Sequence, residues 1–344
     1  MKFEISFILP GYNVVNYVRD CIESILRQPI QNIEIIYVDD VSTDHTADVV
    51  REMALKDNRI KLAEHSQNKG SYAARNTGMQ LAQGKWIIFL DPDDILSPNF
   101  GQSLGAFLND STLNLITYDY ESFNDGEDLP KISHVKNSVE VLETKQLLRR
   151  KDFAWLKLIR TSWLRETGVN FHEGKTMWDI LFHWQLCIKA EKAIYIKENL
   201  IWYRQRSTAS SYRNDWYRAE GFLVMDKLRE FLANSSQLEI YEHEITVKEL
   251  NLFYDIYTSF LGNKDLVKQA LVEVKKRITP CHWSAITEAK NFDKKKKNYL
   301  ITFFRPKSIP WSLKYLPSNI SGLVNCRIIS FKRILSSYFH GLYG

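Results

Sequence analysis

Short apolar runs alternate with amphipathic segments through the first hundred residues, and each run ends at polar or turn-forming residues. The runs cover residues 5–9, 33–38, 60–63 and 86–90, and their length and unbroken apolar character are typical of strands buried on both faces. The segments between them repeat apolar residues at helical spacing. Repeated strand–helix units with short loops predict an α/β fold, with a mostly parallel sheet and helices on both of its faces.

Beyond residue 100 the alternation is less regular. Residues 113–118 and 193–203 have strand character, an amphipathic helix is predicted over 179–190, and helical spacing prevails from about Trp216. The expected parts are a catalytic domain over 1–212, a helical C-terminal domain over 213–292 and a tail over 293–344.

The tail differs from the rest of the chain in its charge. The chain has 46 basic and 41 acidic residues, and ten basic but no acidic residues follow Asp293. Apolar residues of the segment 321–342 fall on one helical face, flanked by Arg327 and Lys332. This pattern predicts a helix that lies in an anionic membrane surface. Packing on a protein surface is the alternative, and nothing in the first domain indicates binding to nucleic acid.

Cysteine usage and the lack of targeting segments indicate the compartment. The four cysteines are far apart and form no CxxC pair, which argues against a zinc site or a disulfide framework. No secretory signal is visible, and no apolar run reaches the roughly 18–20 residues of a membrane span. We therefore expect a cytoplasmic protein, peripheral on the inner face of the cell membrane.

Carboxylates cluster where two of the predicted strands end. Asp91, Asp93 and Asp94 follow the fourth strand, and Asp39 and Asp40 follow the second. Ligands of such sheets bind beyond the carboxyl ends of the strands, so both clusters are expected at one edge. Carboxylates this close repel one another unless a cation neutralises them, and hard oxygen ligands favour Mg²⁺ or Mn²⁺. A solvated acidic turn is the alternative.

Four segments resemble, in order, the motifs of family 2 glycosyltransferases. They read ILPGYN at 8–13, EIIYVDDVSTD at 34–44, NKGSYAARNTG at 68–78 and DPDD at 91–94. The resemblance is close over about residues 3–100 and looser to about 212. It implies a GT-A (Rossmann-like) fold, a nucleotide-sugar donor, usually a UDP-sugar, a divalent metal and inversion at the anomeric carbon.

The resemblance also implies roles for individual residues. Tyr12 would stack on the nucleobase, Asp40 would accept a base N–H, and Asp39 would support it or reach the ribose. In the DxD motif, Asp91 would lie towards the ribose and Asp93 on the metal. The residues implied to contact the donor are Pro10, Tyr12, Asp39, Asp40, Arg75, Asp91 and Asp94, and those implied to hold the metal are Asp93 and Asp91.

Inversion requires a general base that deprotonates the acceptor hydroxyl as it attacks the sugar. Family members carry this base in an acidic pair at the start of a helix. Asp179 matches the second acid and is the predicted base, whereas Trp178 replaces the first, where it would form an aromatic wall. A helix N-cap is the alternative role for Asp179, and Glu173 is the reserve candidate for the base.

Two further positions differ from the family or extend its pattern. Val41 stands where family members commonly have glycine. Arg204 and Arg206 lie in a basic loop that would either close over the diphosphate or remain solvated.

The resulting prediction is an inverting glycosyltransferase that uses Mn²⁺ or Mg²⁺. It would move one or a few sugars from a UDP-sugar to a hydroxyl of a glycan or lipid-linked acceptor, in surface polysaccharide or lipopolysaccharide-type biosynthesis. One alternative is a sugar-phosphate nucleotidyltransferase, which would need a Gly-rich phosphate loop after the first strand. The other is a non-catalytic membrane-bound scaffold, which only Trp178 favours.

Overall fold

The computed structural model describes residues 2–132, 138–206, 215–279, 282 and 285. Its contacts divide the chain into two units, Met1–Leu228 and Arg229–Gly344. The predicted membrane-associating tail, 293–344, lies outside the described residues. Within the described part of the chain, no helix combines the length and the apolar character needed to cross a membrane.

Unit 1 is built on one nine-stranded mixed sheet with the order β3-β2-β1-β4-β8-β6-β9-β5, in which β7 pairs with β9. β1 to β4 are parallel, whereas β8 runs antiparallel to both β4 and β6. The α/β fold expected from the sequence is therefore confirmed. Its continuous parallel part is formed by β1 to β4, and β6 and β9 also pair in parallel. The strands are β1 Phe3–Gly11, β2 Ile33–Asp39, β3 Ile60–Glu64, β4 Gly84–Phe89, β5 Ile95–Leu96, β6 Leu115–Asn124, β7 Val139–Leu142, β8 Lys157–Arg160 and β9 Ala193–Gln205.

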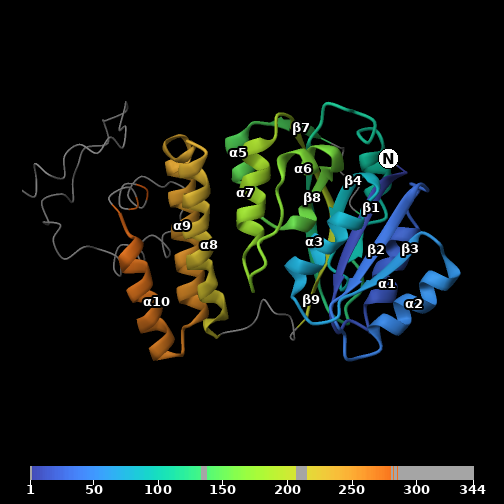
Figure 1. Cartoon of the computed structure of the whole chain (residues 1–344), viewed down its shortest axis with the longest axis horizontal. Coiled ribbons are helices and arrows are strands. Elements are labelled where there is room, and N and C mark those ends of the chain that lie inside the picture. Colours follow the sequence, from blue (N-terminus) through green and yellow to red (C-terminus); the bar gives the residue numbers. More distant parts are fainter. Residues whose placement is uncertain (1, 133–137, 207–214, 280–281, 283–284, 286–344) are drawn as a thin grey trace, which may run out of the picture. The chain divides into compact units, whose positions relative to one another are not determined.

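Helices cover both faces of this sheet (Figure 1). Because side chains alternate along a strand, Phe7 of β1 joins a buried cluster with residues of α1, α2 and α4, whereas Ile8 points to the opposite face. There, a Cβ on Gly78 of α3 would lie 2.2 Å from Ile8 Cγ2, so only glycine allows this close approach. The helices are α1 Val18–Leu26, α2 Thr46–Lys56, α3 Ser71–Leu81, α4 Phe100–Gly105, α5 Thr144–Leu148, α6 Thr161–Thr167 and α7 Asp179–Lys189, with the 3-10 turns η1 Ala154–Leu156 and η3 Trp216–Ala219.

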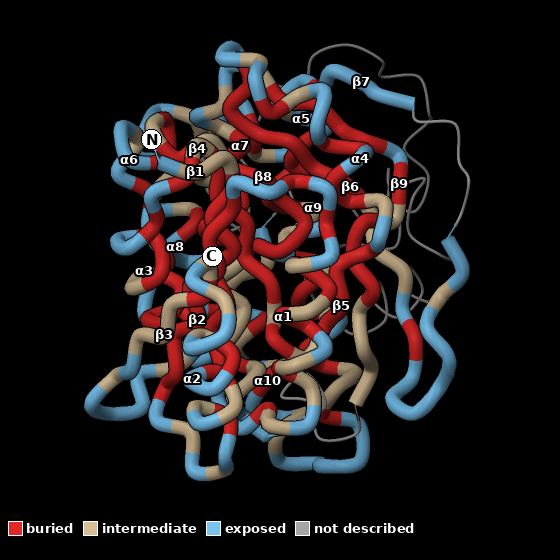
Figure 2. The backbone as a smooth tube through the Cα atoms, turned by 90° about the vertical axis from the view of Figure 1, so that its right-hand side faces the viewer, coloured by how far each residue is buried: buried red, intermediate tan, exposed pale blue. Residues whose placement is uncertain are grey.

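The strands of the central sheet form the buried interior, and the connecting loops are exposed (Figure 2). On the face that carries α3, Phe89 of β4 meets Phe182 of α7 edge-on, with ring centroids 5.9 Å apart. This contact fixes the helix that begins at Asp179 against the same strand that leads into the DPDD segment.

The end of unit 1 lies later in the chain than residue 212, where the sequence pattern placed the end of the catalytic domain. The division falls inside α8, Glu220–Asn234, after Leu228. The carboxylate of Glu220 accepts the backbone N–H groups of Lys175 and Thr176, both at 2.7 Å. These hydrogen bonds hold the start of α8 on unit 1. The onset of helical spacing in the sequence therefore does not coincide with the end of this unit.

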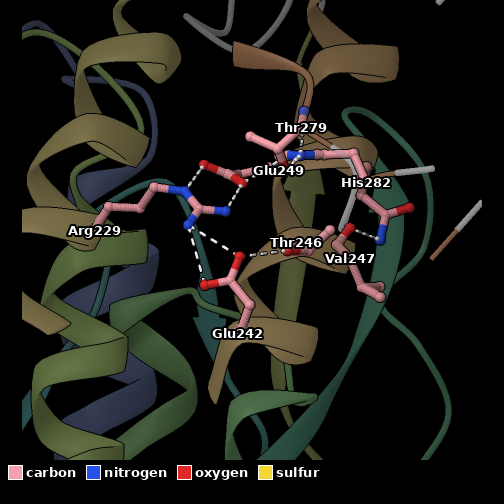
Figure 3. Close-up of polar contacts among 8 residues, drawn as sticks. Arg229, Glu242, Thr246, Val247, Glu249, Thr279 and His282 are labelled. Atoms are coloured by element: carbon pink, nitrogen blue, oxygen red, sulfur yellow. Dashed lines mark hydrogen bonds and ion pairs between the residues drawn. The ribbon is translucent and has the colours of Figure 1, made fainter. Parts of the chain in front are cut away.

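Unit 2 contains the rest of α8 together with α9, Leu238–Ser259, and α10, Lys264–Arg277. Its described interior holds a network of charged groups (Figure 3). Arg229 donates to both oxygens of Glu249, at 2.7 and 2.6 Å, and its Nη1 donates to Glu242 at 3.2 Å. The network joins α8 to α9.

His282 extends this network beyond α10. Its Nε2 lies 2.9 Å from Oε2 of Glu249, and its Nδ1 accepts the backbone N–H of Thr279 at 3.1 Å. Because Nδ1 accepts, the ring proton is on Nε2 and points at the carboxylate. Burial alone would raise the pKa of Glu249, but His282 and Arg229 together lower it.

Candidate active site

The carboxyl ends of β1, β2 and β4 meet at one edge of the sheet, as the motif order predicts. Gly11 pairs with Asp39 where β1 and β2 end, and the backbone N–H of Asp40 donates to Gly11 O at 2.8 Å. The Leu90 N–H donates to Ile8 O at 3.0 Å, which carries β4 on to Asp91. Both predicted acidic clusters therefore lie at this edge.

Asp40 binds the protein's own backbone. Its Oδ1 accepts from the Lys69 N–H at 2.9 Å and contacts His65 Nδ1 at 2.7 Å, and its Oδ2 accepts from the Gly70 N–H at 2.7 Å. This acid, predicted to accept a nucleobase N–H, thus ties the end of β2 to the turn before α3. Each carboxylate oxygen has two lone pairs, so Oδ2 keeps acceptor capacity for a ligand.

Asp39, Pro10 and Tyr12 lie at the same ends of β1 and β2. Asp39 accepts from Ser42 Oγ at 2.6 Å and from the Ser42 N–H at 2.8 Å, which closes the turn after β2. Pro10 is buried within β1. Tyr12 is 49% exposed at the end of that strand, so its ring remains accessible for stacking on a base.

One buried arginine joins Asp91 of the DPDD segment to Asp179, the predicted base. Arg75 of α3 is 5% exposed. Its Nη2 lies 2.7 Å from Asp91 Oδ1, and its Nη1 lies 3.6 Å from Asp179 Oδ1. Burial alone would lower the pKa of Arg75, but the two carboxylates raise it and keep the guanidinium charged. The predicted base is thus placed beside the DxD segment, although 88 positions separate Asp91 from Asp179 in the sequence.

Asp179 is held at its orientation by two more donors, neither of which the sequence pattern revealed. Tyr72 Oη donates to Asp179 Oδ2 at 2.9 Å while it accepts the Trp178 N–H at 3.2 Å, and the Ala154 N–H donates to Asp179 Oδ1 at 3.3 Å. Tyr72 is buried on α3, and its helical spacing alone does not mark it as a partner of Asp179. Its place in the same motif as Arg75 was the available signal.

The remaining carboxylates of the DPDD segment meet the basic end of β9. Arg206 Nη2 lies 2.5 Å from Asp93 Oδ2. The Arg204 N–H donates to Asp94 Oδ1 at 2.9 Å, and Arg204 Nε donates to Asp93 O at 2.9 Å. The loop that was predicted either to close over diphosphate or to remain solvated therefore contacts the acidic segment through Arg204 and Arg206.

A divalent cation suits this donor set. Asp94 is fully buried, its Oδ2 has no hydrogen-bond partner, and burial together with Asp93 and Asp91 raises its pKa well above the usual range. The backbone N–H and the charge of Arg204 oppose this rise only in part, so a further positive group would stabilise the ionised carboxylate. Within the described part of the chain, no three His, Cys, Asp or Glu side chains are grouped to hold a metal by themselves.

The structure places Trp178 in the core and Glu173 at the surface. Trp178 is 1% exposed and packs on His172, with ring centroids 3.8 Å apart, so it forms no wall open to an acceptor. A Cβ on Gly174 would lie 1.7 Å from Trp178 Nε1, which shows how tightly the indole is enclosed. Glu173, the reserve candidate, has an exposed side chain.

Strained backbone flanks the site. Val41 has φ of 66° and Met177 has φ of 64°, in the left-handed region that a β-branched residue rarely adopts. A positive φ is the conformation that glycine adopts without strain, which fits the glycine that the family resemblance implies at the position of Val41. Both residues directly adjoin acids of the site, Asp40 and the Trp178–Asp179 pair.

Sequence comparison relates the chain to known transferases. The family model described as "Glycosyl transferase family 2" matches residues 6–167. Glycosyltransferase GlyG of Streptococcus pneumoniae is 31% identical over 217 residues, which are 59% of this chain and 71% of GlyG. The poly(ribitol-phosphate) beta-N-acetylglucosaminyltransferase TarS of Staphylococcus aureus is 25% identical over 259 residues, covering 73% of this chain and 44% of TarS.

Solved structures share the fold. TarS residues 1–349, crystallised with UDP-GlcNAc, superimpose with a TM-score of 0.57 and 18% identity, over 87% of this chain and 90% of that one. The mannosyltransferase PcManGT from Pyrobaculum calidifontis, in complex with GDP-Man and Mn²⁺, gives a TM-score of 0.50 and 16% identity, over 88% and 84% of the two chains. At these identities the likeness concerns the fold alone.

Proposed function

This chain belongs to glycosyl transferase family 2 and is a glycosyltransferase, and from that premise we propose that it is an inverting enzyme using a UDP-sugar. The acceptor would be a hydroxyl of a glycan or lipid-linked glycan in the biosynthesis of a bacterial surface polysaccharide. The observation that carries the proposal is the bridge of Arg75 between Asp91 and Asp179.

The bridge supports a direct displacement. In the proposed reaction, Asp179 takes the proton of the acceptor hydroxyl while that oxygen bonds to the anomeric carbon. The bond from that carbon to the diphosphate breaks, and UDP leaves with the negative charge. Tyr72 and the Ala154 N–H hold the carboxylate in place, so little reorganisation is needed when the proton moves.

Asp93 and Asp91 would hold Mn²⁺ or Mg²⁺, with substrate phosphates completing the coordination. Such a cation, when bound, offsets the charge that develops on the leaving diphosphate. The raised pKa of Asp94, which Arg204 offsets only in part, and its unpartnered Oδ2 support this assignment. Arg206, whose Nη2 lies 2.5 Å from Asp93 Oδ2, would be a second positive group for the same phosphates.

The donor proposal rests on the family and on two named relatives. TarS was crystallised with UDP-GlcNAc, whereas PcManGT was crystallised with GDP-Man and Mn²⁺. The nucleobase of the donor is therefore the first property to test. The comparisons give no support to a nucleotidyltransferase or a non-catalytic scaffold.

A panel of nucleotide sugars, scored by release of the nucleoside diphosphate, tests the proposal. We expect release of UDP from a UDP-sugar. This release should stop after treatment with EDTA and resume when Mn²⁺ or Mg²⁺ is added. Asp93→Asn should show the same loss without EDTA. Turnover that survives EDTA would contradict the metal assignment, and release from GDP-sugars alone would contradict the uridine donor.

The C-terminal tail, 293–344, is proposed to hold the enzyme on an anionic membrane. The support is its sequence, which has ten basic and no acidic residues after Asp293. The full chain should float with vesicles containing phosphatidylglycerol and leave neutral vesicles unbound. A chain ending at Phe292 that floats equally well would contradict this role.

A further inference from the structure

Four aromatic rings gather beside the candidate base, and the proposed reaction leaves them without a role. Phe153 stacks on Trp155 with centroids 4.9 Å apart and planes at 9°, and Trp155 stacks in turn on Tyr203 at 5.5 Å and 9°. Tyr120 of β6 meets all three edge-on, at 6.2, 5.1 and 6.0 Å. We name these four residues the aromatic platform.

The platform is joined to both halves of the active site. Ala154, between Phe153 and Trp155, donates its N–H to Asp179 Oδ1 at 3.3 Å. At the other end, Tyr203 precedes Arg204, whose N–H donates to Asp94 Oδ1 at 2.9 Å. The chain segments that carry the platform therefore contact both the candidate base and the DPDD segment.

The loop that carries Phe153 is held by a buried lysine. Lys157 is 3% exposed, and its Nζ donates to the carbonyl oxygens of Lys151, Asp152 and Phe153 at 3.2, 3.2 and 2.7 Å. Three charge-assisted hydrogen bonds to consecutive carbonyls fix the path of this loop. The ring of Phe153 is thus presented by a rigid support.

Phe153 differs from the rings beneath it in exposure. Trp155 is 4% exposed, but Phe153 is 39% exposed. One face of Phe153 lies on Trp155, and among the described residues no ring covers the other face. An apolar ring supported in this way beside a catalytic carboxylate has the form of a binding surface rather than of a core position.

We propose that the aromatic platform is an acceptor subsite that binds a pyranose ring through stacking on Phe153. The inference rests on the proposed function, whose acceptor it specifies. The C–H groups on one face of a pyranose carry partial positive charge and match the negative face of an aromatic ring. An open-chain polyol has no such face, so the acceptor ends in a ring sugar, with its reacting hydroxyl directed to Asp179.

Saturation-transfer NMR on the full chain, with UDP and the diamagnetic ion Mg²⁺ present, tests the subsite without requiring turnover. The probes are methyl β-D-glucopyranoside, ribitol as a ring-free control, and farnesyl phosphate as an apolar lipid competitor. The wild type should transfer saturation to H1, H3 and H5, the protons of one pyranose face. Ribitol should give at most a fifth of that signal.

Substitutions assign the signal to the platform. Phe153→Ala should lower the pyranoside signal at least about fivefold, as expected for loss of one stacked pair, and Phe153→Tyr should retain it. Leu55→Ala, which removes an apolar side chain that is 85% exposed on α2, is the matched control and should change nothing. UDP signals in the same spectra report the donor site and the fold of each variant.

The outcomes separate this inference from the proposed function. UDP signals without a pyranoside signal, or a pyranoside signal that survives Phe153→Ala, would overturn the platform alone. An equal ribitol signal would remove the requirement for a ring, and displacement by farnesyl phosphate would assign the platform to lipid. A Phe153-dependent pyranoside signal without UDP binding would keep the subsite and refute the uridine donor.

Discussion

Glu249 in unit 2 and Asp94 in unit 1 are both buried carboxylates, but their surroundings differ. In unit 2, Glu249 accepts from Arg229 and from His282, and these partners lower its pKa. In unit 1, Asp94 has one unpaired oxygen, and burial with neighbouring carboxylates raises its pKa. The chain supplies partners to both oxygens of Glu249, whereas it leaves Asp94 Oδ2 without a hydrogen bond and offsets the Asp94 charge only in part, through Arg204.

The difference separates a structural charge from a functional one. A buried charge whose partners are all supplied by the chain holds helices together. A buried charge that lacks a partner costs stability and persists where a ligand compensates it. Substitutions in the two units should therefore differ in which property they change and in the sign of the change.

The largest effect is expected at the candidate base. Asp179→Asn keeps the shape of the side chain and its acceptor oxygen but cannot take a proton, so transfer should fall by about 10³-fold. Initial rates of UDP formation with acceptor measure the loss, and isothermal titration with UDP serves as the binding control. Transfer within tenfold of the wild type would move the role of base elsewhere, with Glu173 tested next.

Breaking the network of unit 2 should destabilise the chain strongly. Arg229→Met leaves Glu249, 2% exposed, without its main partner, and we expect a loss of about 3 kcal/mol in the free energy of unfolding. Urea unfolding followed by circular dichroism measures it. Glu242→Gln is the matched control, because the Glu242 side chain is 23% exposed and its removal should cost about 1 kcal/mol or less.

The opposite sign is expected in the active site. Asp94→Asn removes a charge that burial and two neighbouring carboxylates disfavour, and its amide oxygen can still accept the Arg204 N–H. Stability at pH 7 should rise by about 1–2 kcal/mol, while transfer falls. A destabilised Asp94→Asn would mean that the chain itself already compensates this carboxylate.

Relief of backbone strain should give a smaller gain. Val41→Gly removes a Cβ at φ of 66° and should add about 1 kcal/mol of stability. Ser236→Gly relieves a similar φ of 57° in unit 2 and is the matched control. Both should raise the melting temperature, but only the change at Val41 should alter the affinity for UDP.

Acid titration gives the smallest and most specific contrast. Because the folded state lowers the pKa of Glu249, its stabilising contribution is present above the ordinary glutamate pKa of about 4.3. It is lost as the pH falls from there through the lower folded value. Glu249→Gln should therefore flatten the acid limb of a plot of unfolding free energy against pH. An unchanged limb would show that other carboxylates control it.

The first four strands and their helices were predictable because each is a local pattern. A buried parallel strand is a continuous apolar run, and the glycine, proline or acid that ends it marks the boundary. β5, with two residues, and the short antiparallel strands β7 and β8 carry no such pattern, because their pairing partners are distant in sequence. β5, β7 and β8 were missed for this reason, whereas the strand segments predicted at 113–118 and 193–203 correspond to β6 and β9.

The site was predictable only as far as its motifs extend. Strand ends brought Asp39, Asp40 and the DPDD segment to one edge, as expected. Contacts between distant segments were beyond the reach of local pattern. Tyr72 on Asp179 and Arg206 on Asp93 are examples, because each joins residues more than a hundred positions apart. Trp178 was misplaced because an aromatic residue beside an acidic one suits a wall and a core equally well in sequence.

The clamp of Asp40 on the N–H groups of Lys69 and Gly70 consists entirely of protein groups. The turn before α3 therefore has its shape before any nucleotide arrives, and binding need not freeze it. Loss of this clamp would make the affinity for nucleotide fall through a less favourable entropy, while the heat released by the remaining contacts stays nearly the same.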